Sequence, residues 1–258
     1  MKNDLNKNNL AVNNLEDNIT PDIHSSSDEY ASRFLGEFGS FALDVQGRAV
    51  LSILEKHDDI KTLLDVGGGH GQLTPYLLEK NYNITIYGSH EVCKKRVEEY
   101  LKNDNCNFKV GSLVCLPFED KAFDAVLCFR QICHLAKWED CIRELSRVSK
   151  KIVIIDYPTY RSFNILNKLF FKLKKKVEEN TRTFKIFFDR EIKEEFFKNN
   201  FKINKRIPQF FMPLVFYRII KKRVLCELSE KFFGVLGLRY LFGSPVIVEA
   251  IRKDDKRN

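Results

Sequence analysis

A cluster of glycines is the feature that most constrains how this 258-residue chain can fold. Four of the five residues 67–71 are glycine, and they directly follow segment 61–66 (KTLLDV), which we predict to be a buried strand. Glycine loses more conformational entropy on folding than other residues, so such a cluster is costly unless the backbone adopts unusual angles or lies against a ligand. A helix beginning after the turn would offer N–H groups to an anion. The cluster predicts a ligand-binding turn; a tight turn without a ligand is the alternative.

Strand and helix patterns alternate after this turn. Strands are predicted at 61–66, 83–88, 107–111, 122–129, 150–158, 201–211 and 244–253. Helices are predicted at 72–80, 91–103, 138–149, 189–200 and 213–234. Strands that alternate with helices of this length form βαβ units, and right-handed crossovers place the helices on both faces of a parallel sheet. We therefore expect an α/β fold with a doubly wound, mostly parallel, seven-stranded sheet.

The N-terminus and one insertion lie outside this pattern. Residues 1–28 are rich in Asn, Asp and Ser, and we expect a disordered tail there. Residues 29–258 are predicted to form one domain, in which 29–57 has helical periodicity and forms an N-terminal helical cap. After the fifth strand, residues 161–185 form a basic, amphipathic helical insertion, which we predict to be a lid that excludes water from a site.

Cysteine usage and charge limit the compartment and the partners. The seven cysteines include no C-x-x-C pair, so we expect reduced thiols in a cytoplasmic protein and no metal site. The polar N-terminus predicts no signal peptide.

The net charge is unevenly distributed along the chain. Residues 161–258 contain 24 Lys and Arg against 11 Asp and Glu, a net charge of +13, whereas residues 1–160 have a net charge of −5. The basic half favours an anionic partner, such as a lipid surface, a phosphorylated substrate or RNA, or it is simply a solvated face.

The spacing of the glycines excludes two common phosphate-binding turns. The pattern G-x-G-x-x-G fails because Gln72 or Thr74 stands where the third glycine is required, and no lysine follows as in a P-loop. The turn instead has the form acid-x-Gly-x-Gly-x-Gly, from Asp65 to Gly71. Here the chain resembles the class I S-adenosylmethionine (SAM) dependent methyltransferases, over roughly residues 61–160. The resemblance implies a Rossmann-like methyltransferase fold with SAM as cofactor, and its central run is similar to the ubiquinone-biosynthesis type.

Two further segments carry the same resemblance. Residues 111–129 (GSLVCLPFEDKAFDAVLCF) are similar to the family's link between the third and fourth strands, and 134–158 are similar to the next helix and strand. The matching residues are Leu116, Pro117, Phe118, Phe123, Asp124, Arg143, Glu144 and Arg147.

The resemblance implies a set of cofactor-binding residues: Asp65, Gly67, Gly68, Gly69, Gly71, Tyr87, Ser112, Leu113, Phe129 and Arg130. Two of them depart from the family pattern. Tyr87 stands where an acid usually bonds the ribose hydroxyls, and it could make one such bond or stack on the adenine. Ser112 stands where an Asp contacts the adenine. The loss of two charged hydrogen bonds predicts weaker SAM binding, cofactor binding by apolar packing, or a non-catalytic relative. We expect His70, within the turn, at the solvent edge.

Methyl transfer leaves few marks in a sequence, because it needs mainly proximity and a dry pocket. His134, after the fourth strand, is the candidate general base; a histidine packed at a helix start is the alternative. We expect a small-molecule or lipid-like acceptor methylated at oxygen or carbon. The basic insertion predicts peripheral membrane contact or a helix packed with its lysines outward. An RNA-directed methyltransferase, for which no RNA-binding module is visible, and a non-catalytic SAM-fold protein are the other hypotheses. The sequence leaves the oligomeric state open.

Overall fold

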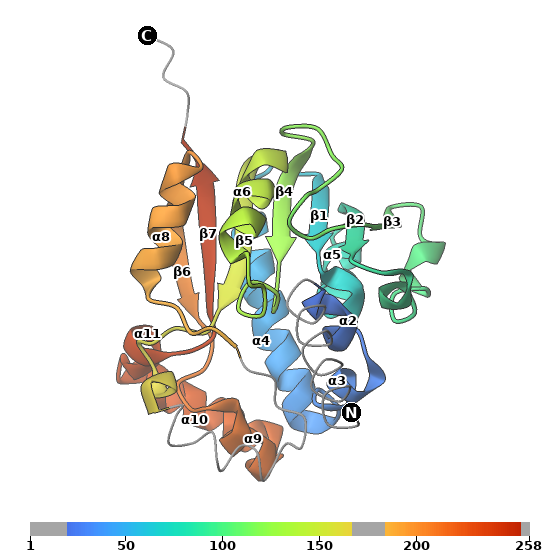
Figure 1. The fold of residues 1–258 in the computed structure, drawn as a ribbon. Helices are drawn as coiled ribbons and strands as arrows, with labels where there is room; N and C mark the ends of the chain where they lie inside the picture. Colours follow the sequence, from blue (N-terminus) through green and yellow to red (C-terminus); the bar gives the residue numbers. More distant parts are fainter. Residues whose placement is uncertain (1–19, 167–183, 254–258) are drawn as a thin grey trace, which may run out of the picture.

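One seven-stranded sheet forms the centre of the protein. The computed structural model describes residues 20–166 and 184–253 (Figure 1). The strands lie in the order β3-β2-β1-β4-β5-β7-β6; β1 to β5 are parallel, and β7 runs antiparallel to both neighbours. The strands are β1 (Thr62–Val66), β2 (Asn83–Gly88), β3 (Cys106–Val110), β4 (Phe123–Cys128), β5 (Ser149–Tyr157), β6 (Phe201–Pro208) and β7 (Val246–Arg252). The predicted fold class and all seven predicted strands are confirmed.

The central strands are apolar because both of their faces are covered. Leu63 and Leu64 are adjacent in β1, point to opposite faces and belong to two different core clusters. In the neighbouring strand, Val126 and Leu127 divide between the same two clusters. Such strands lack the alternation of apolar and polar residues that is typical of a sheet with one exposed face, as is usual in parallel sheets.

Helices cover the two faces of the sheet. In the described residues from 36 onward, the α-helices are α4 (Gly36–Leu54), α5 (Thr74–Glu79), α6 (Trp138–Val148), α8 (Asp189–Lys198), α9 (Leu214–Ile220), α10 (Arg223–Val235) and α11 (Leu238–Phe242). Helix α6 packs on β4 and β5 and against α8, whereas α4 contacts α5, β7 and α10. Within the described part of the chain, no helix combines the length and apolarity needed to cross a membrane.

Two predicted helices differ from the structure. The segment 91–103 forms only short 3-10 turns, η2 (Glu91–Lys94) and η3 (Tyr100–Lys102), instead of a helix. Nδ1 of His90 accepts a hydrogen bond from the Val92 N–H at 3.1 Å, a local bond that competes with helix formation. The predicted helix 213–234 is divided into α9 and α10, because Lys221 adopts a left-handed conformation with φ 60°.

The predicted boundary of the disordered tail is wrong for residues 20–28. These residues include α2 (Pro21–Ser25), and α3 (Asp28–Ser32) follows directly. Helix α2 contacts the glycine turn η1 (Gly68–His70) at the edge where the parallel strands end (Figure 1). The cap prediction for 29–57 agrees with α3 and α4. The predicted tail residues 1–19 lie outside the described residues.

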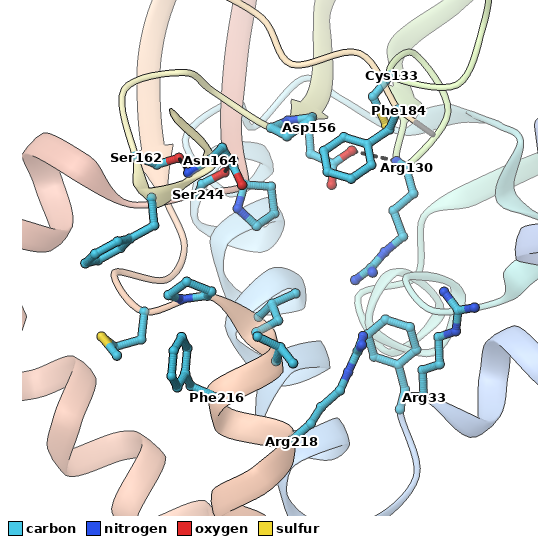
Figure 2. A pocket seen from close by; sticks show the side chains of 18 of the residues that line it. Arg33, Arg130, Cys133, Asp156, Ser162, Asn164, Phe184, Phe216, Arg218 and Ser244 are labelled. Carbon is cyan, nitrogen blue, oxygen red and sulfur yellow. Dashed lines mark hydrogen bonds between the residues drawn. The ribbon is translucent and has the colours of Figure 1, made fainter. Parts of the chain in front are cut away.

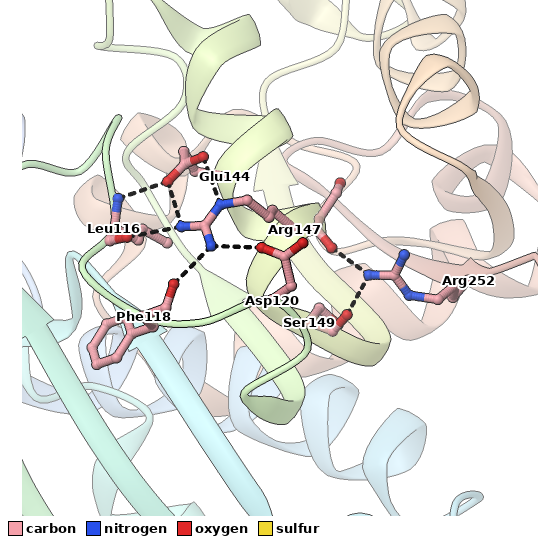
Figure 3. A network of polar contacts seen from close by, with 8 residues as sticks. Leu116, Phe118, Asp120, Glu144, Arg147, Ser149 and Arg252 are labelled. Atoms are coloured by element: carbon pink, nitrogen blue, oxygen red, sulfur yellow. Dashed lines mark hydrogen bonds and ion pairs between the residues drawn. The ribbon is translucent and has the colours of Figure 1, made fainter.

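The link between β3 and β4 is fixed by an arginine of α6. The Arg147 guanidinium donates to the backbone carbonyls of Leu116 (2.8 Å) and Phe118 (2.7 Å), and it pairs with Glu144 and Asp120 (Figure 3). Glu144 in turn accepts the Leu116 N–H at 2.8 Å. Because the bonded carbonyls belong to a loop that has no strand hydrogen bonds of its own, the α6 side chains supply the hydrogen bonds that the loop backbone requires.

Of the predicted insertion, η4 (Phe163–Leu166) is described, and 167–183 lie outside the described residues.

Candidate functional site

The turn after β1 depends on glycine at specific positions. Gly67 and Gly71 have φ of 74° and 67°, in the left-handed region that other residues rarely adopt. A Cβ at Gly67 would collide with the side chain of Gln131, and a Cβ at Gly68 would collide with the Asp65 carboxylate. The Gly67 N–H donates to the carbonyl of Tyr87 at 2.7 Å, which joins the turn to the end of β2.

Buried polar atoms without hydrogen-bond partners gather around this turn. Asp65 is fully buried, neither carboxylate oxygen has a partner among the described residues, and burial raises the pKa of this carboxyl to about 7. Four more buried side-chain oxygens have no hydrogen-bond partner among the described residues: Oγ of Ser26, Oε1 of Gln72, Oγ1 of Thr74 and Oε1 of Gln131. A buried polar atom without a partner is costly, so such atoms are normally few and scattered. Their concentration beside one glycine turn indicates a polar ligand there.

His70 departs from its predicted place. The prediction put it at the solvent edge, but it is 5% exposed, and its Nδ1 accepts the Gln72 N–H at 3.1 Å. Burial, together with the nearby Arg130 and Arg96, lowers the pKa of His70 to about 3. The imidazole is therefore neutral at physiological pH and has a structural place within the turn.

The remaining predicted cofactor residues divide between core and surface. Tyr87 is fully buried, and its ring packs edge-on against Phe118, 5.5 Å between centroids, which does not leave it free to stack on an adenine. Ser112 is exposed, and its Oγ accepts the Val114 N–H at 3.3 Å. The side chains of Leu113 and Phe129 belong to two core clusters. Besides backbone atoms, these positions offer a ligand the Tyr87 hydroxyl, which is buried and has no hydrogen-bond partner among the described residues.

Sequence reasoning missed the N-terminal residues that cover the turn. Asp22 of α2 is fully buried and accepts hydrogen bonds from the N–H (2.6 Å) and the Oγ (2.5 Å) of Ser89, directly after β2. A carboxylate thus lies at the end of β2, where the family pattern has an acid, but it comes from the N-terminal segment. Gln131 donates through Nε2 to the Gly67 carbonyl and to Oγ of Ser25, both at 3.1 Å. We call the segment 21–26 the N-terminal strap.

These residues suit SAM in chemistry. The ammonium group of SAM could satisfy the Asp65 carboxylate, and the N–H groups of the turn could bind its carboxylate. The same observations show that the strap and Gln131 cover the turn. A ligand at the turn therefore requires both to shift.

A cavity of about 290 Å³ adjoins the strap. Its lining includes Arg130, the predicted cofactor residue (Figure 2). It also includes His134, the candidate base. Arg130 has φ of 62°, and its N–H donates to the buried carboxylate of Asp156 at 2.6 Å. Burial raises the pKa of Asp156, and the Arg130 charge opposes the rise. The His134 N–H donates to the Gln131 carbonyl at 2.8 Å, and its ring lies edge-on to Phe184 at 6.4 Å. His134 thus lies on the wall between turn and cavity.

Comparison with known proteins identifies the central part of the chain. Residues 64–154, which run from β1 to β5, match a family described as a methyltransferase domain. This segment is therefore similar to methyltransferase domains. The match contains the glycine turn, for which SAM binding stays a prediction. The narrower similarity to the ubiquinone-biosynthesis type stays a prediction.

A curated relative agrees with this assignment. An uncharacterised methyltransferase of Schizosaccharomyces pombe is 36% identical over 112 residues, which are 39% of this chain and 39% of that protein. The chain thus matches about two fifths of the length of this relative.

Solved structures with low identity share the fold. A SAM-dependent methyltransferase from Thermotoga maritima, described as a possible histamine N-methyltransferase, has a TM-score of 0.62 at 20% identity, covering 88% of this chain and 96% of that chain. Magnesium protoporphyrin IX methyltransferase from Synechocystis, with bound S-adenosylhomocysteine (SAH), has a TM-score of 0.56 at 13% identity, with coverage of 84% and 85%. A geranyl diphosphate methyltransferase has a TM-score of 0.57 at 15% identity, with coverage of 81% and 78%. They support the class I methyltransferase fold.

Proposed function

We propose that the protein is a SAM-dependent methyltransferase that acts on oxygen or carbon of a small-molecule or lipid-like acceptor. The glycine turn with its unpartnered buried polar atoms is the observation that carries the proposal, because it lies within the matched methyltransferase domain. When bound, SAM supplies an activated methyl group. Asp65 and the N–H groups of the turn would hold its amino acid end.

The acceptor would bind in the cavity next to the turn. His24 and Arg130 line the cavity, while their chain neighbours Ser25 and Gln131 lie on the turn, so one layer of residues separates the two sites. His134 is the cavity's candidate to remove a proton from an acceptor hydroxyl. The structurally similar magnesium protoporphyrin IX methyltransferase and geranyl diphosphate methyltransferase are consistent with a small-molecule acceptor.

Calorimetry with SAM and SAH tests the first step. We expect both to bind the full-length chain at a 1:1 ratio and to raise its melting temperature. Asp65→Asn should weaken SAM binding by at least about tenfold, since the ammonium loses a charged partner. A thermal-shift screen would then select acceptors that bind, and the appearance of the labelled methyl group of SAM in each acceptor would measure transfer.

A non-catalytic protein of the same fold is the second candidate. It is favoured by the strap and Gln131, which cover the turn. Absence of both heat and thermal shift with SAM and SAH would support this candidate and contradict the first.

Peripheral contact with an anionic membrane is also proposed. Helix α10 has an exposed apolar stripe that consists of Val224, Leu225, Leu228, Phe232 and Val235. The exposed Leu236, directly after the helix, extends this stripe. Exposed Lys221, Lys222 and Lys231 flank it, as in interfacial helices. In a flotation assay with anionic vesicles, Leu228→Ser with Phe232→Ser should reduce binding several-fold, whereas Phe197→Ser on α8 should not. Equal binding to neutral vesicles, or no loss in the double variant, would contradict this contact.

A further inference from the structure

A second cavity, of about 630 Å³, lies between α4, α10 and α11. Phe41, Val45 and Arg48 line it from α4, and Gln209 lines it directly after β6. In Figure 1, α10 and α11 lie at the lower left, apart from α2 at the glycine turn. Among the described residues, none lines both this cavity and the one beside the turn. We call it the α10 cavity, and it is separate from the site of the proposed reaction.

Two residues that line the α10 cavity have a buried polar atom without a hydrogen-bond partner. Gln209 and Glu230 are each 3% exposed. Nε2 of Gln209, a donor, and Oε2 of Glu230 have no partner among the described residues. A buried polar atom that stays unpaired costs free energy, so native structures contain few of them. Two such atoms in the lining of one cavity indicate a ligand that can pair with both.

The Glu230 carboxyl is held in place through its other oxygen. Oε1 accepts a hydrogen bond from the Phe211 N–H at 2.8 Å and another from the Tyr217 hydroxyl. Burial raises the pKa of Glu230, and these two hydrogen bonds oppose the rise. The backbone of Gln209 is fixed as well, because its N–H donates to the Pro245 carbonyl at 3.0 Å. Both residues are therefore positioned before any ligand binds.

Much of the remaining wall of the α10 cavity is apolar. Val224, Leu228 and Val235 line it from α10, and residues spaced by four and seven positions lie on one face of a helix. Three of the five residues of the exposed stripe on α10 are thus part of this wall. The volume of about 630 Å³ lies within the range of ligand pockets, about 300–1,000 Å³. An apolar part of a ligand would cover these side chains.

The charges around the α10 cavity restrict the ligand further. Arg48, Lys231 and Arg239 are part of the lining. Like charges repel, so these cations disfavour a cationic ligand, and the Glu230 carboxyl disfavours an anionic group next to it. The surroundings therefore favour a polar group that is neutral.

We propose that the α10 cavity binds a neutral ligand with an apolar part, whose amide or hydroxyl group accepts a hydrogen bond from Nε2 of Gln209 and pairs with Oε2 of Glu230. An amide suits both atoms because it has a C=O and an N–H side by side, and a hydroxyl both donates and accepts through one oxygen. The proposal goes beyond the proposed function, because neither the glycine turn nor methyl transfer takes part in it.

Hexanamide, 1-hexanol and 2-heptanone are probes that separate hydrogen bonding from apolar burial. 2-Heptanone has the shape of hexanamide, but a methyl group replaces the NH₂ group. In an NMR titration of the full-length chain, hexanamide or hexanol should shift the side-chain N–H signals of Gln209, which are assigned by their loss in Gln209→Met. The better of the two should bind at least about fivefold more tightly than 2-heptanone, which has no donor for Glu230.

Comparison of hexanamide with hexanol identifies which group the cavity prefers. If neither probe shifted the Gln209 signals, or if 2-heptanone bound as tightly as both, the proposal would be overturned.

Gln209→Met separates binding from stability. It replaces an unpaired buried donor by an apolar side chain of similar size, so the melting temperature of the ligand-free protein should stay the same or rise. Binding of the preferred probe should weaken at least about fivefold. Asn204→Leu is the matched contrast, because Nδ2 of Asn204 donates to the buried Glu249 at 2.7 Å and Asn204 does not line the cavity. This variant should melt at a lower temperature and bind the probe normally.

A clear fall in the melting temperature of Gln209→Met would mean that Nε2 has a structural partner in solution, and it would overturn the proposal. Glu230→Gln is the second variant, because it keeps an oxygen for the Phe211 N–H and puts an NH₂ group in place of Oε2. It should also weaken binding of the preferred probe at least about fivefold. Unchanged probe binding in both variants would contradict the site.

Cofactor affinity shows whether this site and the proposed function fail separately. Because Gln209 does not line the cavity beside the turn, SAM affinity of Gln209→Met should stay within about twofold of that of the unmodified chain. A loss of SAM affinity equal to the loss of probe affinity would overturn the proposal of a separate site. If the unmodified chain bound the probe but not SAM, the proposed function would fail and the α10 site would stand.

Discussion

The glycine turn and the arginine-lined cavity are neighbours at one edge of the sheet, but they are built in opposite ways. The turn offers backbone N–H groups and a few buried oxygens, and two left-handed glycines set its shape. The cavity offers guanidinium groups and aromatic rings from α3, α9 and the loops after β4 and β5. The turn therefore does not tolerate larger residues. In the cavity, by contrast, substitution of the lining side chains can change which ligand binds while the backbone stays the same. This division suits an enzyme fold with one cofactor and many possible acceptors.

The largest expected effect comes from adding a single methyl group to the turn. Gly67→Ala places a Cβ against Gln131 at a φ of 74°, so we expect SAM affinity to fall at least about 100-fold by calorimetry. Gly237→Ala is the matched control, because it has φ of 73° and nothing within 4 Å of the added Cβ. Both variants should lose about 1 kcal/mol of stability from backbone strain. Unchanged SAM binding in Gly67→Ala would place the cofactor elsewhere.

A pH dependence specific to the turn is the next largest effect. Burial raises the pKa of Asp65 from 3.8 to about 7 in the folded chain. Because the folded pKa is the higher one, the contribution of this group to stability is full below about pH 4 and is lost as the pH rises to about 7. Relative to Asp65→Asn, the ligand-free protein should therefore lose on the order of 2–4 kcal/mol of unfolding free energy between pH 4 and 8.

Denaturant unfolding of both proteins across that range measures this difference. Parallel curves for the two proteins would show that the Asp65 carboxyl is ionised throughout, and that it has a partner in solution. A matching experiment with Asp156→Asn compares the carboxyl of the cavity, whose pKa burial also raises but which has the Arg130 N–H as a partner.

A substitution in the strap should produce the smallest effect, and we expect it to change the rate at which SAM associates. Asp22→Ala removes the two hydrogen bonds to Ser89 and so loosens α2 over the turn. If the strap must move before SAM reaches the glycines, stopped-flow measurement should show an association rate about fivefold faster. Ser32→Ala, which removes an exposed local bond to the Glu29 carbonyl, is the control. A slower association in Asp22→Ala would indicate that the carboxylate binds the cofactor rather than restrains the strap.

The residues explain why some parts of the structure could be predicted and others could not. Thr62–Val66 and the other strands are short apolar runs bounded by polar segments, and the turn consists mostly of consecutive glycines. Both features can therefore be predicted from neighbouring residues in the sequence. The strap is polar by composition, and it is held by distant residues: Asp22 accepts from Ser89, 67 residues later, and Ser25 accepts from Gln131. Arg218 likewise reaches the cavity through the packing of α9. Such long-range pairings leave no mark in the local sequence pattern.

The reversed direction of β7 has a practical consequence. Because β7 runs antiparallel to β5, its last residue, Arg252, lies at the sheet edge opposite the glycine turn, where it donates to the Ser146 and Ser149 carbonyls (Figures 1 and 3). An affinity tag or surface tether attached beyond Arg252 would leave both ligand sites open. A fusion joined directly to Thr20 would instead add its bulk next to the strap.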